Sequence, residues 1–355
     1  MLSLRGLWVA LAAEGVLIAA ALLSLLVLRI YLAGRGRRVD AGVRALEPVL
    51  HRWLMNDVEP AAIVAILARL PPPVAFRALA RLAPGQLTFQ RQQVLAPLLR
   101  HEAWVERLLQ RGGSRLWWRR FDVARLLSIV GGGDDAALVE RLLRDPHPAV
   151  RLVAIDAATR LGGQLVDVEL DLLPSRQDAV QQYQFAALGR HPAVVATALV
   201  RRLQPDAPPG ALNAWIDAAG ALASPEPLDR ARDLANHPRP DVRLHVARAL
   251  RRHADPDTAP ILMGLLADED WRVRAQAARA LGALRARDAT SLLALTVCDP
   301  SWWVRYRSAL ALAQIGGTSR QVLLEVARGD DPMARDMAVL VAGLSPAAVV
   351  EMSEV

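Results

Sequence analysis

The sequence of 355 residues contains no lysine, because all 43 of its basic residues are arginine. This absence excludes a lysine nucleophile, a Schiff base and the lysine of a phosphate-binding loop. The single cysteine, Cys298, excludes a disulfide framework and a cysteine-based metal cluster. Aromatic residues are scarce, at 5% of the chain. The remaining composition is 53% hydrophobic and 22% charged, a balance that predicts a folded chain.

Motifs of catalytic and metal-binding sites are missing as well. The histidines show no metal-ligand spacing such as HExxH, and no serine lies in a G-x-S-x-G elbow. The run Gly131-Gly132-Gly133 has no following lysine and no preceding strand, so we expect an inter-helix turn there. Cys298 is expected to be a packed thiol. The sequence therefore predicts no enzymatic activity, no cofactor and no metal site.

The amino-terminal residues have the composition of a membrane segment. Residues 7–33 read LWVALAAEGVLIAAALLSLLVLRIYLA, and residues 15–28 carry no charge. Roughly 20 apolar residues are needed to cross the ~30 Å hydrocarbon core of a bilayer. A signal peptide is the alternative, but its apolar core would be shorter and followed by a small-residue cleavage site. We predict a retained transmembrane helix at 7–33, preceded by a short extracytoplasmic segment at 1–6.

Arginine is distributed unequally around this segment. Arg5 precedes it, whereas Arg35, Arg37, Arg38 and Arg44 follow it. Because positive flanks are retained on the cytoplasmic side, we predict a single-pass protein of a bacterial inner (plasma) membrane, with its amino terminus outside and its body in the cytoplasm. Arg35, Arg37 and Arg38 are expected to contact anionic lipid headgroups.

The rest of the chain is repetitive. Val-Arg pairs occur at 150–151, 242–243, 273–274 and 304–305, and the last three pairs are 31 residues apart. After each pair, apolar residues recur with helical spacing, and a turn and a second short helix follow. Such units bury a core only by stacking, so residues 115–355 are predicted to form an all-α solenoid of about eight repeats with a period of 30–31. The repeats are anchored at positions 120, 151, 181, 212, 243, 274, 305 and 335.

Residues 34–114 are expected to form a basic juxtamembrane segment and a helical cap on the solenoid. Breaks between the helices are predicted at Pro71-Pro72-Pro73 and at Pro84-Gly85. A separate small helical domain is the alternative. The predicted helices lie at 43–54, 59–70, 73–83, 90–99 and 104–110.

The repeated pattern D-P-x-x-x-V-R-x-x-A-x-x-A-L-G resembles the HEAT repeat, including the short form found in phycobilisome-lyase-type HEAT-like proteins. The resemblance covers roughly residues 115–345 and is strongest at the anchors 151, 243, 274 and 305. It implies that aspartate and arginine side chains form a structural ladder between neighbouring repeats. The corresponding residues are Asp145, Asp268 or Asp270, Asp299, Arg151, Arg243, Arg274 and Arg305.

Tryptophans at the repeat edges are the first candidates for binding a protein partner. Trp117, Trp271 and Trp302 each lie three positions before an anchor, and Trp118 and Trp303 lie beside two of them. These side chains either pack over the neighbouring turn or form exposed anchors for a partner. The second interpretation follows from the frequency of tryptophan at binding hot spots.

The resemblance also implies that the Val-Arg helices line the concave face of the solenoid. Its less buried positions form either a basic, partly aromatic groove for a partner or an ordinary solvated surface. They are Tyr183, His245, Arg248, Arg252, Arg279, Tyr306 and Arg307.

The formal net charge of +7 does not indicate nucleic-acid binding, because +3 of it lies in residues 1–40 and the large remaining body carries only +4. The sequence predicts a membrane-anchored scaffold or adaptor that holds a protein partner, such as a membrane enzyme complex, at the cytoplasmic face. The alternative is a lyase-like HEAT protein that holds a small ligand or chromophore in its groove. Nucleic-acid binding is the least favoured of the three hypotheses.

Overall fold

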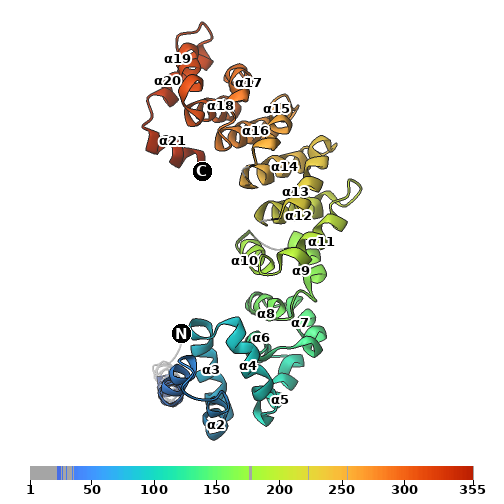
Figure 1. Cartoon of the computed structure of the whole chain (residues 1–355), viewed down its shortest axis with the longest axis vertical. Helices are drawn as coiled ribbons and strands as arrows, with labels where there is room; N and C mark the ends of the chain where they lie inside the picture. Colours follow the sequence, from blue (N-terminus) through green and yellow to red (C-terminus); the bar gives the residue numbers. More distant parts are fainter. Residues whose placement is uncertain are drawn as a thin grey trace, which may run out of the picture. The chain divides into compact units, whose positions relative to one another are not determined.

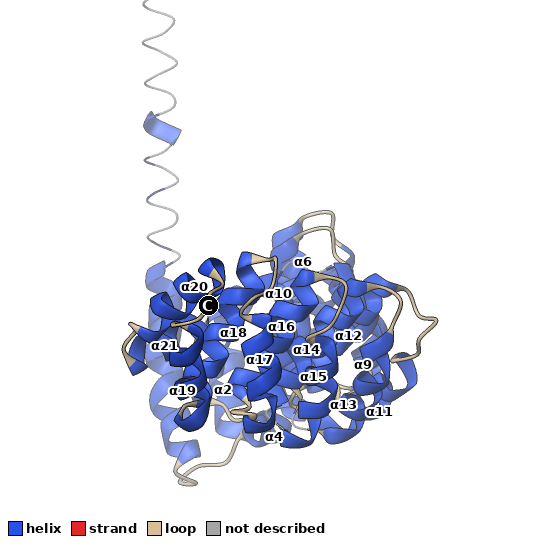
Figure 2. Ribbon diagram, turned by 90° about the horizontal axis from the view of Figure 1, so that it is seen from above, coloured by secondary structure: helices blue, strands red, loops and turns tan. Residues whose placement is uncertain are grey.

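The computed structural model describes residues 36–354 except 176, 177, 223 and 254, together with 22–24, 26, 29 and 34. These residues form helices joined by turns, with no strand among them (Figure 1; Figure 2). The prediction of an all-α chain is confirmed. Most of the predicted transmembrane segment 7–33 lies outside the described residues, as does Arg35. Arg37 and Arg38 are exposed on a helical segment at 36–54.

Within the described part of the chain, no single helix is long and apolar enough to cross a membrane. One pair of consecutive helices, Pro332–Ala342 and Pro346–Ser353, meets the same criterion by length and composition only. This pair is bent by 113° at the intervening turn.

Each of the eight anchor positions lies near the start of its own helix. Proline is the first residue of several of these helices, because its missing N–H would be unpaired there in any case. The period found in the sequence is therefore the spacing of successive helical hairpins. We call the following the anchor helices: α6 (Trp117–Val130), α8 (Pro148–Arg160), α10 (Asp178–Leu188), α12 (Pro209–Ala221), α14 (Pro240–His253), α16 (Trp271–Ala283), α18 (Trp302–Ile315) and α20 (Pro332–Ala342).

Shorter helices alternate with the anchor helices along the chain and form a second layer. Within residues 161–355, the anchor helices α12, α14, α16 and α18 pack side by side, each against the next (Figure 1). Alternating helices stacked in this way are the arrangement predicted for a solenoid. The second-layer helices are α7 (Ala136–Leu143), α9 (Val166–Leu172), α11 (Pro192–Arg202), α13 (Pro225–Arg232), α15 (Ala259–Leu265), α17 (Thr290–Thr296) and α19 (Gly317–Val326).

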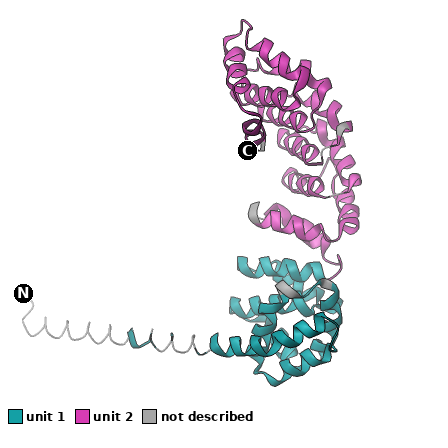
Figure 3. Ribbon diagram, turned by 60° about the vertical axis from the view of Figure 1, so that its left-hand side comes forward, with its two compact units in different colours: residues 1–160 teal, residues 161–355 magenta. Residues whose placement is uncertain are grey.

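The chain divides into two compact units, residues 1–160 and 161–355 (Figure 3). This boundary lies inside the predicted repeat array rather than at residue 114. The reason is that the amino-terminal helices share one hydrophobic core with Leu126, Ile129 and Val130 of α6. The cap and the first repeats are thus one packed body. Its amino-terminal helices are the segment 36–54, α2 (Ala61–Arg69), α3 (Pro72–Gln86), α4 (Phe89–Arg100) and α5 (Ala103–Leu109).

The helix break predicted at Pro84-Gly85 is wrong, because α3 continues to Gln86. Proline has no N–H to donate to the carbonyl of Ala80, one turn earlier. In the structure, the Arg125 guanidinium of α6 donates a 2.8 Å hydrogen bond to that carbonyl oxygen. A contact from a neighbouring helix therefore replaces the lost backbone bond, and local sequence patterns contain no sign of it.

Arginines of three anchor helices pair with an aspartate in the turn before the next anchor helix. The pairs are Arg120 with Asp145, Arg243 with Asp268 and Arg274 with Asp299. Their Nε–Oδ2 distances are 2.5, 2.6 and 2.7 Å, and Nη2 donates to the second carboxylate oxygen in each case. Nη1 donates to two backbone carbonyls of the preceding turn. Each arginine therefore joins two neighbouring repeats and closes its own turn.

Three of the residues proposed for the ladder have other contacts. Among the described residues, Arg151 and Arg305 bond only to the backbone carbonyls of their own turns. The prediction that Asp270 belongs to the ladder is wrong, because its carboxylate does not bridge two repeats. It accepts the backbone N–H of Arg272 and caps α16. The bridging carboxylate of this turn is that of Asp268, two residues earlier, which also accepts the N–H of Asp270.

Small residues allow neighbouring anchor helices to approach closely. Gly220 of α12 faces Ala249 of α14, and a Cβ atom on this glycine would lie 2.7 Å from the Ala249 Cα. Carbon atoms that are not bonded to each other do not pack at that distance, so the two helix backbones would have to separate. In contrast, no atom lies within 4 Å of a Cβ added to Gly264 of α15.

Replacing Gly220 by alanine is therefore expected to lower the free energy of unfolding by about 1–3 kcal/mol, the usual cost of overpacking a core. The matched control, Gly264→Ala, is expected to leave stability unchanged or to raise it by up to ~1 kcal/mol, because alanine favours helix more than glycine. Thermal unfolding of the two variants measures the difference. Equal unfolding temperatures would contradict a tight contact between α12 and α14.

Candidate functional site

The tryptophans at the start of α16 and α18 are exposed. Trp271, Trp302 and Trp303 are 44%, 46% and 50% exposed. Trp302 stacks on Tyr306, one helical turn later, with ring centroids 5.0 Å apart and an interplanar angle of 16°. Trp303 meets Trp302 edge-on at 4.9 Å. The start of α18 therefore presents two tryptophan rings to solvent, one of them stacked on the half-buried Tyr306, one repeat away from Trp271.

The tryptophan pair of α6 is arranged differently. Trp117 is 39% exposed and stacks face to face on His147, with ring centroids 3.8 Å apart. The rings of Trp118 and Phe121 lie nearly perpendicular to it, with ring centroids 6.1 and 6.4 Å away. Trp117 thus packs over the turn before α8, whereas Trp118 is 50% exposed and faces solvent.

A helix of the same chain covers part of the predicted basic groove. The last helix, α21 (Pro346–Glu354), packs against the anchor helix α18. Arg279 Nε of α16 donates a 2.9 Å hydrogen bond to the carbonyl of Ser353, and Arg307 Nη1 of α18 donates a 3.0 Å bond to the carbonyl of Met352. The Tyr306 hydroxyl lies 3.1 Å from the Met352 sulfur. These three side chains of the predicted groove therefore contact α21.

This contact was not predicted from the sequence. An amphipathic signal was present, because apolar residues recur after Pro346 and one of them, Val349, is only 3% exposed in the structure. The partner surface of that helix could not be found from spacing alone, because it combines residues of two different repeats.

Positive charge is concentrated where α21 ends. Burial and the neighbouring charges of Arg251, Arg307 and Arg248 lower the pKa of Arg279 to about 10. Burial also lowers the pKa of Arg307 below its usual value. The carboxyl end of a helix carries partial negative charge and unpaired carbonyls, and both favour nearby cations. The arginines of α14, α16 and α18 therefore form a surface suited to the carboxyl end of a helix.

The remaining residues of the predicted groove lie farther along the anchor-helix layer. His245 Nδ1 lies 3.0 Å from Asp217 Oδ2 of α12, and Arg252 Nη1 contacts the Asp217 carbonyl at 3.4 Å. These contacts join α14 to α12. Arg248 is half-buried, and Tyr183 of α10 is 39% exposed.

The prediction of a packed thiol is wrong, because Cys298 is exposed. It lies in the turn after α17, next to the fully buried Val297. Partial burial and the Asp331 carboxylate raise the pKa of its thiol. Gly131-Gly132-Gly133 connects α6 to α7, as expected for a turn. The described residues contain no group of three or more His, Cys, Asp or Glu side chains that could hold a metal ion.

The hairpins, the ladder and the close helix packing match a known repeat. The family model of HEAT repeats matches residues 196–274 and 264–343. These residues are therefore similar to HEAT repeats. The match includes α12, α14, α16 and α18, so the surface on which α21 lies falls within the matched residues. No curated protein matches the sequence.

Solved structures with the same fold include karyopherins. Kap121p has a TM-score of 0.54 at 15% sequence identity, over 90% of this chain and 42% of that one. Kap121p bound to Nup53p gives 0.54 at 17% over 85% and 40%. The karyopherin Kap121p bound to the SUMO protease Ulp1p gives 0.53 at 16% over 89% and 42%. The chain thus spans about two fifths of the length of these structures, and at this identity the likeness is one of fold.

Proposed function

We propose that this chain is a scaffold or adaptor that binds a protein partner on the anchor-helix surface of α14, α16 and α18. The observation that carries the proposal is the position of α21. A short helix lies on that surface, held through its last carbonyls by Arg279 and Arg307 and through an apolar side chain by Tyr306. A partner helix of similar chemistry would meet the same donors and the same aromatic ring.

The exposed aromatic rings extend this surface. Trp302 and Trp303 lie within one turn of Tyr306 on α18, and large aromatic side chains contribute much of the energy at protein interfaces. Solenoids recognise partners through extended rigid surfaces of this kind. A protein ligand is also supported by a structure with the same fold, since Kap121p is found bound to Nup53p. We propose no enzymatic activity, no cofactor and no nucleic-acid ligand.

The proposal includes membrane anchoring by residues 7–33 in a bacterial inner membrane. An anchor would raise the local concentration of a membrane-associated partner at the scaffold. The exposure of Arg37 and Arg38 on the helical segment that follows is compatible with contact to anionic headgroups. We propose that the amino terminus is external and that the HEAT repeats are cytoplasmic.

A topology reporter fused after Val355 tests this orientation. A reporter that is active only in the cytoplasm is expected to give a signal, and one that is active only outside the membrane is expected to give none. The reason is that more arginines follow the apolar segment than precede it. The matched control moves the arginines of positions 35, 37 and 38 in front of the segment. That variant is expected to invert the signals, and external activity of the unaltered chain would contradict the orientation.

The binding surface can be tested by photo-cross-linking in the full chain. A photoreactive residue at position 302, in the aromatic cluster, is expected to cross-link to a discrete partner. The control is position 295 of α17, where Leu295 is 71% exposed in the second layer. Replacing Arg307 by glutamine is expected to reduce the cross-link from position 302. Equal cross-linking from positions 302 and 295 would overturn the proposed surface.

A further inference from the structure

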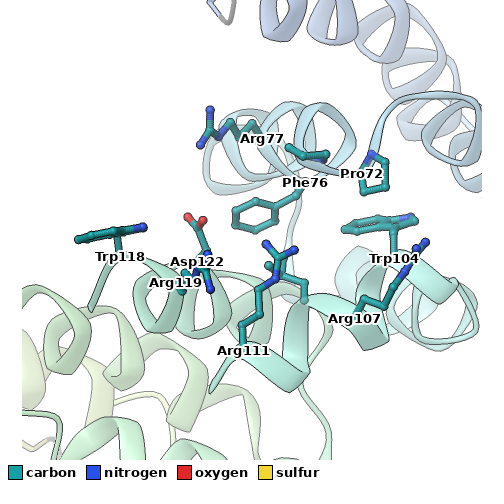
Figure 4. Close-up of a pocket in the computed structure, with 11 residues that line it drawn as sticks. Pro72, Phe76, Arg77, Trp104, Arg107, Arg111, Trp118, Arg119 and Asp122 are labelled. Carbon is teal, nitrogen blue, oxygen red and sulfur yellow. The ribbon is translucent and has the colours of Figure 1, made fainter. Parts of the chain in front are cut away.

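We propose that a pocket in the first unit binds an acidic peptide segment that inserts one apolar side chain. The pocket lies between α3, α5 and α6 and has a volume of about 370 Å³ (Figure 4). All of its lining residues belong to residues 72–122, so it is a site of the first unit alone. It shares no residue with the anchor-helix surface of α14, α16 and α18.

The floor of the pocket is apolar and aromatic. Phe76 comes from α3, and Trp104 and Leu108 come from α5, where a spacing of four residues places both on one helix face. These three side chains are 4%, 6% and 8% exposed, so they are fixed by packing. Trp118 of α6 forms the opposite side and is 50% exposed. A single aromatic or aliphatic side chain fits such a floor.

The rim of the pocket is strongly basic. The arginines that line it are Arg77 of α3, Arg107 of α5, Arg111 of the short turn Gln110–Gly113 after α5, and Arg119 of α6. Asp122 is the only acidic lining residue. No ion pair among the described residues involves Arg107, Arg111 or Arg119. Figure 4 shows the Arg111 side chain extending toward Phe76 and Trp104. The pocket therefore combines an apolar centre with uncompensated positive charge around it.

This arrangement determines the class of ligand. The arginines approach from different helices, so one small anion would engage only one or two of them. A peptide with several carboxylates flanking one apolar side chain can pair with guanidinium groups on several sides while its apolar side chain covers Phe76. Guanidinium and carboxylate groups form bidentate hydrogen bonds, which are strong and would stabilise the peptide in this arrangement.

The volume agrees with a single inserted side chain. Pockets for small molecules have volumes of about 300–1,000 Å³, and this pocket lies near the lower limit. The site would therefore bind a short linear peptide segment rather than a large cofactor. It would give the protein a second contact point, in a different unit from the surface described above.

Fluorescence anisotropy with a labelled synthetic peptide tests the proposal on the full chain in detergent. The probe has one phenylalanine flanked on each side by aspartate and glutamate. Replacing Arg111 by glutamine, or Trp118 by alanine, is expected to weaken binding at least tenfold. Arg111→Lys is expected to recover part of the affinity. Replacing the phenylalanine of the probe by serine is expected to weaken binding to a similar extent.

Matched controls separate the pocket from general charge effects. Arg115 is an exposed arginine near Arg111 that does not line the pocket, and Trp303 has the same 50% exposure as Trp118. Arg115→Gln and Trp303→Ala are expected to leave binding of the probe unchanged. Equal losses from Arg111→Gln and Arg115→Gln, or equal binding of the serine peptide, would overturn the proposal. Displacement of the probe by inorganic phosphate at matched concentration would also overturn it, since the site would then bind a simple anion.

Discussion

Replacing Arg243 by alanine is expected to lower the free energy of unfolding by about 3–5 kcal/mol, the range found when one partner of a buried ion pair is removed. The side chains of Arg243 and Asp268 are only 10% and 5% exposed. The substitution removes both bonds to the carboxylate and leaves Asp268 buried without its cation. It also removes the bonds to the carbonyls of His237 and Pro238. Urea unfolding of the full chain, followed by circular dichroism, measures the loss.

Arg305 provides a matched control for this variant. It is 8% exposed and donates to two carbonyls of its own turn in the same way, but it has no ion-pair partner among the described residues. Arg305→Ala should therefore cost less, about 1–2 kcal/mol, because no carboxylate is left unpaired. The double variant Arg243→Met with Asp268→Leu should recover much of the stability, since apolar pairs replace buried ion pairs well. Equal losses from Arg243→Ala and Arg305→Ala would contradict a ladder held by its ion pairs.

Deleting residues 344–355 is expected to open the anchor-helix surface of α16 and α18 to an added helix. A labelled synthetic peptide of residues 344–355 should bind the truncated chain at least tenfold more tightly than the full chain. In the full chain, the tethered α21 is an internal competitor with an effective concentration that reaches the millimolar range for short tethers. Fluorescence anisotropy measures both affinities, and circular dichroism confirms that the truncated chain is folded.

Two variants of the truncated chain sharpen this experiment. Arg307→Gln should weaken binding of the peptide several-fold, because the bond to the Met352 carbonyl is lost. Arg335→Gln in α20 alters an arginine whose ion pair is with its neighbour Asp336 and should leave binding unchanged. Equal affinity of the peptide for the full and truncated chains would show that α21 does not compete for the surface, and would remove the main support for the proposed function.

The repeat architecture could be predicted from the sequence because its signals are local and periodic. A hairpin of two amphipathic helices needs only a few turns of chain, and stacking repeats the same contact every 30 or 31 residues. The positions of the anchor helices followed directly from the Val-Arg spacing. The register of the tryptophans also placed Trp271 and Trp302 at helix starts, where the structure leaves them exposed.

Errors arose where two residues compete for one role or where a distant group intervenes. Asp268 and Asp270 both precede α16, and spacing alone does not show which carboxylate faces Arg243 and which caps the helix. Pro84 reads as a helix break because the donor that compensates for it, Arg125, lies about forty residues later and on another helix. Such outcomes depend on the relative position of helices in space.

The sequence by itself thus determined the helical class, the repeat period and the positions of most helices, because each depends on residues close together in the chain. Only the tertiary structure decided which surfaces are open. It placed α21 over Arg279 and Arg307, and it brought Phe76 of α3 next to Trp104 of α5. These sites join residues of separate helices, and helix packing, rather than local spacing, sets the distances between them.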